Sequence, residues 1–290
     1  SCYGYMGNKH APIGDDDIAS SVTLTGQAVI KYSNELIKQF IKKEVPNISD
    51  RDLEECIIYN DTDSSYVTIT PLIEQGVKFL DGEDIHKETL DKIQEIEDYL
   101  NKGVGEWAKK ALLTKDSRFI FKRECIADVG VFLQKKRYVM HILDDEGIKE
   151  NKFKYTGVEV VRTTMPNAIK PYAKKIIETM LMTQSLGKTN ALLNETYEIF
   201  KGLGPQELAF VMGVKGYEKY STQCNQFTTT KGMPIHVKSA YFYNMLLEKL
   251  NTGNKYEAIG TGDKVRYMYI EQPNKFGLES IGFKYDYPKE

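Results

Sequence analysis

The chain has 290 residues, 41% of them hydrophobic, which is enough to form one or two cores and excludes the intrinsically disordered class. No apolar run approaches the roughly 20 residues that cross a membrane and no charged-then-apolar leader opens the chain, so we expect neither a membrane-embedded nor a secreted protein. The net charge is only −2, and the four cysteines are far apart with no His nearby, so we expect a reduced, intracellular protein without a zinc site.

The first segment, residues 1–8, is rich in glycine and tyrosine and reads Ser-Cys-Tyr-Gly-Tyr-Met-Gly-Asn. Gly4 permits a close approach of another group to the backbone. Taken alone, this composition is that of an ordinary terminal loop.

A long helix is predicted over residues 17–43, and we expect it to be structural. Apolar residues recur there mostly at steps of three and four, which places them on one helical face, and the acidic residues 15–17 supply a cap and first-turn anions. The apolar residues are Val22, Val29, Tyr32, Leu36 and Phe40.

An acidic turn, predicted within a hairpin at residues 55–70, is the most informative stretch. Asp61 and Asp63 stand two positions apart in the run Tyr-Asn-Asp-Thr-Asp-Ser, with apolar residues on both sides. At an effective dielectric constant of 20, like charges about 4 Å apart repel by roughly 4 kcal/mol, so such a pair is stabilised by a cation. A hairpin with a merely acidic turn is the alternative, because Asn, Asp and Ser are common turn formers.

Next come a helix predicted at about 86–111 and strands near 118–133 and 137–143, which we expect to complete one sheet with the hairpin. Glu124 is either an accessory acid or an ordinary charge at a strand end. The basic segment between the strands is either a phosphate contact or a solvated turn, and it consists of Lys135, Lys136, Arg137 and Tyr138.

The C-terminal half is predicted to be mainly helical from Pro166 onward, because proline suits the first residue of a helix. A Thr-, Gln- and Gly-rich stretch at 217–232 indicates a long loop, and residues 265–270 form a β-like run. The expected helices are 167–186, 189–202, 205–213 and 236–251.

Charge is distributed unevenly between the two halves. Residues 1–150 carry 20 Lys and Arg against 28 Asp and Glu, whereas residues 151–290 carry 19 against 13. A basic half that grips a polyanion and an acidic half that holds metal ions would produce this asymmetry, although many unrelated two-domain proteins show one.

In this order, the segments resemble the signatures of family B DNA polymerases. The acidic turn resembles motif C, residues 1–8 resemble the second half of motif B cut between its Asn and Ser, and Lys-Lys-Arg-Tyr resembles the Lys-x-Tyr signature. Residues 157–166, and more loosely 232–237, resemble the palm-to-thumb passage and thumb of T-even-type bacteriophage polymerases. The resemblance covers nearly the whole chain and is most specific in its first half.

The resemblance implies roles for individual residues. Asp63 matches the principal motif C ligand of a two-Mg²⁺ site, Asp61 the more peripheral acid, and Glu124 an acid nearby. Tyr3 and Gly4 match residues beside the nascent base pair. The positions that match DNA contacts are Ser64, Thr25, Lys135, Lys136, Arg137 and Tyr138.

An α+β fold is also implied, in which a palm with an antiparallel sheet and packed helices precedes a mainly helical thumb. Residues 1–8 would be the end of the fingers, 9–155 the C-terminal part of the palm, and 156–290 a thumb that is incomplete at its C-terminal end.

Several parts of the family pattern have no match here, namely the exonuclease domain, the rest of the fingers and the motif A Asp. We therefore expect the chain alone to be inactive. Expected partners are primer-template DNA, dNTPs, an N-terminal polymerase fragment with those parts, and a sliding clamp bound through a tail that this chain does not match. A phage protein of this kind would act in the cytoplasm of its bacterial host.

Ser1 would suit a polymerase split by an intein, because splicing needs a hydroxyl or thiol on the first downstream residue and family B genes host inteins at this point. An engineered or proteolytic fragment explains the same start.

Two other functions stay open. A non-catalytic DNA-binding or scaffold protein could keep this fold, but it has no need of a carboxylate pair beside phosphates. The palm of a reverse transcriptase carries a Tyr-x-Asp-Asp turn, from which Thr62 between the two acids differs.

Overall fold

The computed structural model describes residues 2–8, 11–12, 14–224, 229–274 and 277–286, and it describes side chains from Gly4 onward. The chain divides into two compact units, Ser1–Lys154 and Tyr155–Glu290. Both contain helices and small antiparallel sheets, which confirms the α+β class. Within the described ranges, no helix is both long and apolar enough to cross a membrane.

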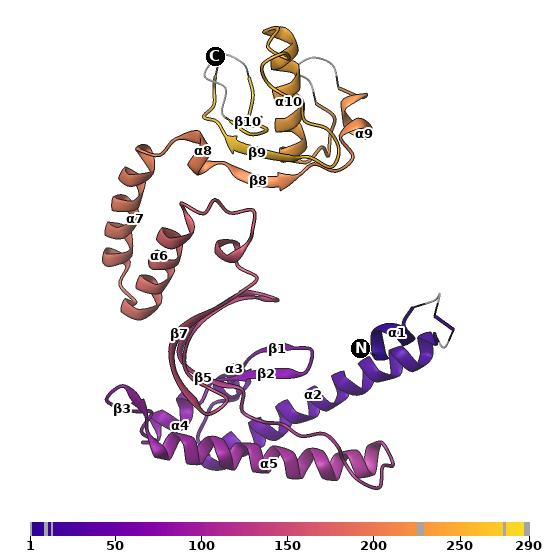
Figure 1. The fold of residues 1–290 in the computed structure, drawn as a ribbon. Helices are drawn as coiled ribbons and strands as arrows, with labels where there is room; N and C mark the ends of the chain where they lie inside the picture. The colour runs from indigo at the N-terminus through magenta and orange to yellow at the C-terminus, as the bar shows by residue number, and fades with distance from the viewer. Residues whose placement is uncertain (1, 9–10, 13, 225–228, 275–276, 287–290) are drawn as a thin grey trace. The chain divides into compact units, whose positions relative to one another are not determined.

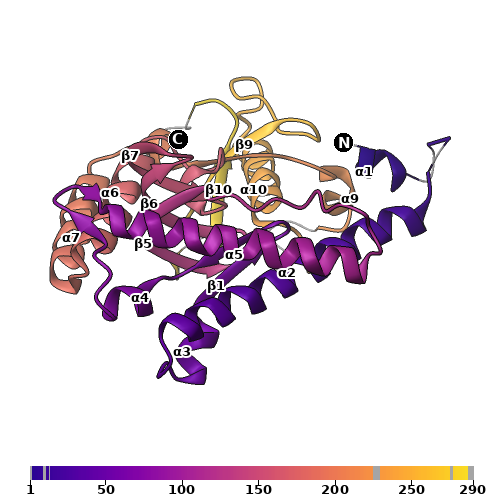
Figure 2. The same ribbon diagram turned by 90° about the horizontal axis from the view of Figure 1, so that it is seen from below.

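Unit 1 begins with helices and continues into short hairpins and one larger sheet (Figures 1 and 2). Its helices are α1 (Cys2–Met6), α2 (Asp16–Glu44), α3 (Asp50–Glu55), α4 (Thr70–Glu74) and α5 (Lys87–Ala111). Its strands are β1 (Ile57–Asp61), β2 (Ser64–Val67), β3 (Leu80–Asp81), β4 (Asp84–Ile85), β5 (Cys125–Gln134), β6 (Arg137–Asp145) and β7 (Ile148–Thr156), the last of which runs into unit 2.

Helices α2 and α5 lie side by side and form the core of unit 1 (Figures 1 and 2). The carboxylate of Asp15 caps α2 by accepting the N–H groups of Asp17 and Ile18, at 2.9 and 3.0 Å. The bounds of α2 and α5 confirm the predicted helices 17–43 and 86–111 to within a residue at each end. Their shared apolar interior consists of Val29, Leu36, Ile37, Ile41, Leu100 and Val104.

The hairpin and the later strands do not form one sheet, so that expectation was wrong. Strands β1 and β2 pair only with each other, and β5, β6 and β7 form a separate antiparallel sheet in the described part of the chain. Residues 118–124 are also not a strand. The backbone N–H of Phe121 donates to Asn101 Oδ1 on α5 at 2.7 Å, and Asn101 Nδ2 donates to the backbone carbonyl of Phe121 at 2.9 Å. These two hydrogen bonds replace those that a neighbouring strand would make there.

Unit 2 combines helices with a three-stranded antiparallel sheet in the order β10-β9-β8. Its helices are α6 (Lys170–Thr183), α7 (Leu186–Lys201), α8 (Pro205–Leu208), α9 (Tyr217–Ser221) and α10 (Ile235–Lys249), with a 3-10 turn η1 (Glu159–Val161). Its strands are β8 (Phe210–Gly213), β9 (Lys264–Tyr269) and β10 (Ser280–Phe283).

The sequence-based predictions for two segments of unit 2 were wrong in part. The helix expected over 205–213 ends at Leu208, because Phe210–Gly213 pairs with β9 instead. The loop expected over 217–232 begins with the short helix α9. Phe210–Gly213 is a strand because of its long-range pairing with β9, and local sequence periodicity carries no information about such pairing.

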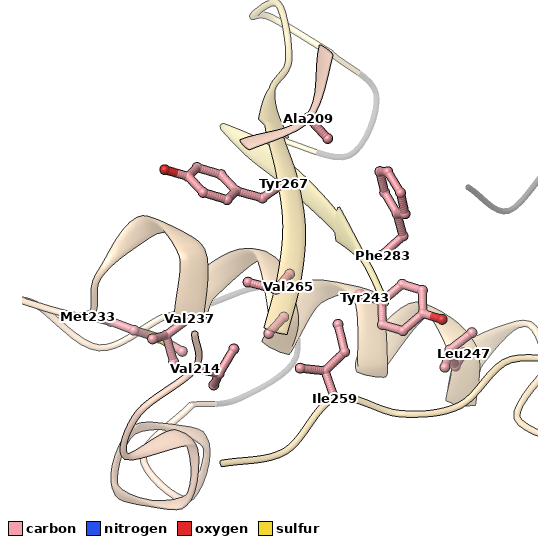
Figure 3. Close-up of a cluster of buried hydrophobic side chains, with 11 residues drawn as sticks. Ala209, Val214, Met233, Val237, Tyr243, Leu247, Ile259, Val265, Tyr267 and Phe283 are labelled. Carbon is pink, nitrogen blue, oxygen red and sulfur yellow. The ribbon is translucent and has the colours of Figure 1, made fainter. Parts of the chain in front are cut away.

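Helix α10 covers one face of this sheet and forms the core of unit 2 (Figure 3). Val237 and Tyr243 of α10 lie in one buried cluster with Val265 of β9 and Phe283 of β10, and Val237, Val265 and Phe283 are fully buried. Burial of each such side chain contributes roughly 1.5–3 kcal/mol relative to exposure, so this cluster stabilises the unit.

Gly282 of β10 packs closely against the backbone of α10. A Cβ at this position would lie 2.8 Å from Val265 Cγ2 and 3.0 Å from the backbone oxygen of Ser239. Gly282→Ala should destabilise unit 2 by about 1–3 kcal/mol through overpacking. Gly213→Ala, in β8 of the same sheet, meets nothing within 4 Å and is the control. Urea unfolding measures both, and equal free energies of unfolding would contradict this packing.

Candidate active site

The acidic turn joins β1 to β2 and is unusually tight. The N–H of Asp63 donates to the carbonyl of Asp61 at 2.6 Å, which places Thr62 between them at φ +55°. A β-branched residue rarely adopts a positive φ, so the turn is held in a strained conformation by its surroundings. The Ser64 hydroxyl donates to the same Asp61 carbonyl at 3.1 Å. Both carboxylates are therefore presented at the tip, with Asp63 exposed and the Asp61 side chain 23% exposed.

Helix α2 anchors the hairpin through Ser65. The Ser65 hydroxyl lies 3.0 Å from the amide oxygen of Asn34 on α2 and 2.7 Å from that of Asn60 on β1. The hairpin is thus fixed to the long helix α2.

Four aromatic side chains, Tyr59, Tyr66, Phe132 and Tyr138, form what we call the aromatic cluster. Ring centroids within it are 5.2–6.0 Å apart, and two members come from the β1–β2 hairpin and two from β5 and β6. The hydroxyls of Tyr66 and Tyr138 are 2.7 Å apart. Burial, together with the hydrogen bond to Tyr138, raises the pKa of Tyr66 well above its ordinary value.

The basic turn, Lys135–Lys136, joins β5 to β6 and lies beside the acidic turn. Lys136 has φ +60°, and its N–H donates to the hydroxyl of Tyr59 at 2.9 Å. Its ammonium group is 3.6 Å from Asp61 Oδ1. The structure therefore brings Asp61 and Lys136, residues 75 positions apart in the sequence, into one site.

Tyr138 occupies a different environment from the two lysines. Lys135 and Lys136 are exposed and Arg137 is half-buried, whereas Tyr138 is only 5% exposed. The Tyr138 side chain lies inside the aromatic cluster, where it contacts Tyr66 rather than the surface.

The remaining predicted residues lie on other elements of unit 1. Glu124 is exposed just before β5 and forms an ion pair with Lys154 at 3.0 Å. Thr25 is half-buried on α2, and Gly4 is exposed on α1. Tyr3 belongs to α1, but its side chain lies outside the described residues, as does Ser1.

A groove of about 1030 Å³ runs along the hairpin and β5. Consecutive residues line it, Thr62–Ile69 on one side and Cys125–Phe132 on the other. Since neighbouring side chains of a strand point to opposite faces, consecutive lining means that the groove follows the backbone edges of these strands. Beneath it lie the apolar faces of α2 and α5, and both Asp63 and Glu124 are on its wall.

Asp61 and Asp63 fit one side of a site for a hard divalent cation. Mg²⁺ prefers oxygen ligands and is usually held by one or two carboxylates together with substrate phosphates. In the part of the chain that the structure describes, no three His, Cys, Asp or Glu side chains gather as a metal-binding group. Two carboxylates at the tip therefore account for part of a cation site, and other ligands would have to complete it.

Sequence reasoning missed the aromatic cluster and a buried histidine. The ring of His141 on β6 is 5% exposed and lies 2.8 Å from Asp128 Oδ1 and 2.8 Å from Asn151 Oδ1, which links the three strands of the sheet. Asp128 is also on the wall of the groove. The cluster had a signal in the sequence, because a Tyr stands on each side of the acidic turn and a Phe and a Tyr flank the basic one.

Comparison with known proteins relates the chain to DNA polymerases. The family described as DNA polymerase family B matches residues 1–88, a range that includes the acidic turn. The DNA-directed DNA polymerase of Escherichia phage RB69 is 24% identical over 302 residues. The alignment covers 98% of this chain but 32% of that polymerase, so the chain spans about a third of the length of this relative. Both matches support a relation to phage-type family B polymerases.

The Tyr66 hydroxyl should make the stability of unit 1 depend on pH. Because the pKa of Tyr66 is raised in the folded state, folded Tyr66 keeps its proton when the pH passes the ordinary tyrosine value of about 10, whereas Tyr66 of the unfolded chain loses it. The free energy of unfolding therefore falls as the pH rises above about 10. Tyr66→Phe should cost about 1 kcal/mol at pH 8 and lose less stability between pH 8 and pH 11 than wild type. Urea unfolding tests this, with Tyr5→Phe at a 48% exposed tyrosine as control. Equal losses in wild type and Tyr66→Phe would contradict the assignment.

Proposed function

We propose, starting from its similarity to family B DNA polymerases, that this chain is the palm-and-thumb part of a phage-type replicative DNA polymerase. Its substrates would be primer-template DNA and dNTPs, and it would act in the cytoplasm of a bacterial host. The observation that carries the proposal is the proximity of the two turns. Asp61 Oδ1 of the acidic turn lies 3.6 Å from Lys136 Nζ of the basic turn, and Tyr59 of the aromatic cluster binds the backbone of Lys136. A carboxylate pair beside a cluster of cations would suit transfer of a nucleotidyl group from a dNTP to the primer 3′-hydroxyl, with release of pyrophosphate, at a site that holds two Mg²⁺ ions.

Each part of the site has a role in this reaction. Bound Mg²⁺ would neutralise the charge that develops on the phosphoryl group. Asp63, as the exposed acid, would be the principal ligand and Asp61 the peripheral one, with Glu124 nearby as an accessory acid. Lys135, Lys136 and Arg137 would hold phosphates near the primer terminus, because Lys and Arg side chains position DNA through its backbone.

Buried Tyr138 would act in a different way from these cations. It would support the basic turn from below instead of touching DNA, since its side chain is enclosed in the aromatic cluster. Ser64 and Thr25 would lie along the template path, and Tyr3 and Gly4 would test the geometry of the new base pair.

The groove supports a requirement for an N-terminal polymerase fragment. Unpaired strand edges are binding sites for another strand. Within the described residues, the outer edges of β2 and β5 are unpaired and border one groove over the apolar faces of α2 and α5. We propose that a strand carrying the motif A Asp fills it and supplies the ligand that Asp61 and Asp63 lack. The other partners would be a sliding clamp and, where the polymerase is encoded in two pieces, a split intein that uses Ser1.

The purified chain alone should not extend a primer, because two carboxylates from one turn hold only part of a two-metal site. Gel analysis of a labelled primer with template, dNTPs and Mg²⁺ checks this. Template-directed extension by the chain alone would show that no second fragment is needed.

The chain assembled with an N-terminal polymerase fragment should extend a primer, and Asp63→Ala should lower kcat by about a thousand-fold. That factor corresponds to a loss of roughly 4 kcal/mol of transition-state stabilisation. Asp81→Ala is the matched control, since Asp81 is an exposed acid at the β3–β4 turn of the same unit, and its activity should equal that of wild type. Failure of the wild-type assembly to extend any primer would instead favour a DNA-binding scaffold.

A further inference from the structure

The acidic and basic turns are held together without shared sheet hydrogen bonds. In the described residues, β1 and β2 form one sheet and β5 and β6 belong to another. Two hydroxyl contacts bridge them, Lys136 N–H to Tyr59 Oη at 2.9 Å and Tyr66 Oη to Tyr138 Oη at 2.7 Å. Of these two contacts, only the first reaches the backbone of a turn.

Tyr59 is placed to act on both turns. It lies two residues before Asp61 on β1, so a shift of its backbone moves the acidic tip. Its ring is fixed between those of Tyr66, Phe132 and Tyr138, at centroid distances of 5.6, 5.8 and 6.0 Å. A ring with three aromatic neighbours has little freedom, and its hydroxyl therefore offers a fixed acceptor to the neighbouring turn.

Lys136 needs such an acceptor because of its backbone conformation. A lysine at φ +60° is in the left-handed region, which non-glycine residues enter only where the surroundings impose it. The ion pair between Lys136 and Asp61 is not enough to impose it, since the lysine side chain is 63% exposed and exposed ion pairs contribute little. The pairing of Gln134 with Arg137 in the β5–β6 ladder closes this turn, and the hydrogen bond to Tyr59 is the backbone contact that holds it against the β1–β2 hairpin.

We propose that Tyr59 is a positioning residue, which sets the basic turn against Asp61 and Asp63 by holding the backbone of Lys136. The proposal rests on the proposed polymerase function for its catalytic consequence, but not for the contact itself. The loss of one hydroxyl would let the basic turn move relative to the acidic tip while the packed ring keeps the hairpin folded.

Tyr59→Phe tests this, because it removes the hydroxyl and keeps the ring. Tyr217→Phe in unit 2 is the matched control, since the half-buried Tyr217 likewise accepts a hydrogen bond, from Asn244 Nδ2 at 2.8 Å. Amide hydrogen exchange at Lys136 in the isolated chain should be at least about tenfold faster in Tyr59→Phe than in wild type and unchanged in Tyr217→Phe. This readout needs no polymerase activity.

Steady-state primer extension by the assembled polymerase gives the second readout. Tyr59→Phe should lower kcat about tenfold while the KM for dNTP and the affinity for primer-template stay within about twofold, because misplacement of a bound group slows reaction more than binding. Tyr217→Phe should keep the wild-type kcat. A purely structural role would instead lower the fraction of folded enzyme in both variants alike.

Three results would overturn the proposal: unchanged exchange at Lys136, a kcat of Tyr59→Phe within about twofold of wild type, or an equal loss of kcat in Tyr217→Phe. If the wild-type assembly extends no primer, the proposed function fails, while exchange at Lys136 still decides whether Tyr59 holds the basic turn.

Discussion

Two hairpins of unit 1 carry opposite charges at their tips, and aromatic side chains join them in place of a shared ladder of backbone hydrogen bonds. The centroids of Phe132 and Tyr138 are 5.2 Å apart, and those of Tyr66 and Phe132 are 5.3 Å apart. Each aromatic pair contributes about 0.5–1.5 kcal/mol beyond the area it buries. The distance between the acidic and basic turns therefore follows from packing beneath them, and the positions of Asp61 and Lys136 depend on it.

In this arrangement, the aromatic cluster provides the stability and the charged side chains of the two turns contribute little to it. Asp63 and Lys136 are exposed at the two tips, and the ion pair between Lys136 and the half-buried Asp61 adds little to folding because its ammonium group is solvated. The charged groups stay available for a substrate because the aromatic cluster, and not their ion pair, fixes the positions of the two turns. The strained backbone of Thr62 and Lys136 fits the same division, since both residues are kept at a positive φ by neighbours rather than by their own preference.

Local sequence patterns predicted what depends on local structure. The apolar spacing gave α2 and α5 within a residue, and the turn residues gave the β1–β2 hairpin with Asp61 and Asp63 at its tip. The patterns failed where contacts with distant segments determine the local structure. Phe210–Gly213 is a strand because β9 pairs with it, and residues 118–124 are irregular because Asn101 takes the backbone of Phe121.

The site follows the same rule. The acidic and basic residues were found from their types and spacing in the sequence. The burial of Tyr138, the contact of Tyr59 with Lys136 and the groove between two strand edges arise from three-dimensional packing, which residue spacing does not encode.

The most direct test of the central claim is an experimental structure of the chain assembled with an N-terminal polymerase fragment, primer-template, Mg²⁺ and a non-hydrolysable dNTP. We predict that the Asp63 carboxylate coordinates a metal ion at about 2.1 Å beside the primer 3′ end, with the basic turn on the primer phosphates and a strand filling the groove. A structure in which Asp63 faces solvent, while the metal ions are held elsewhere and the groove stays unfilled, would contradict the account.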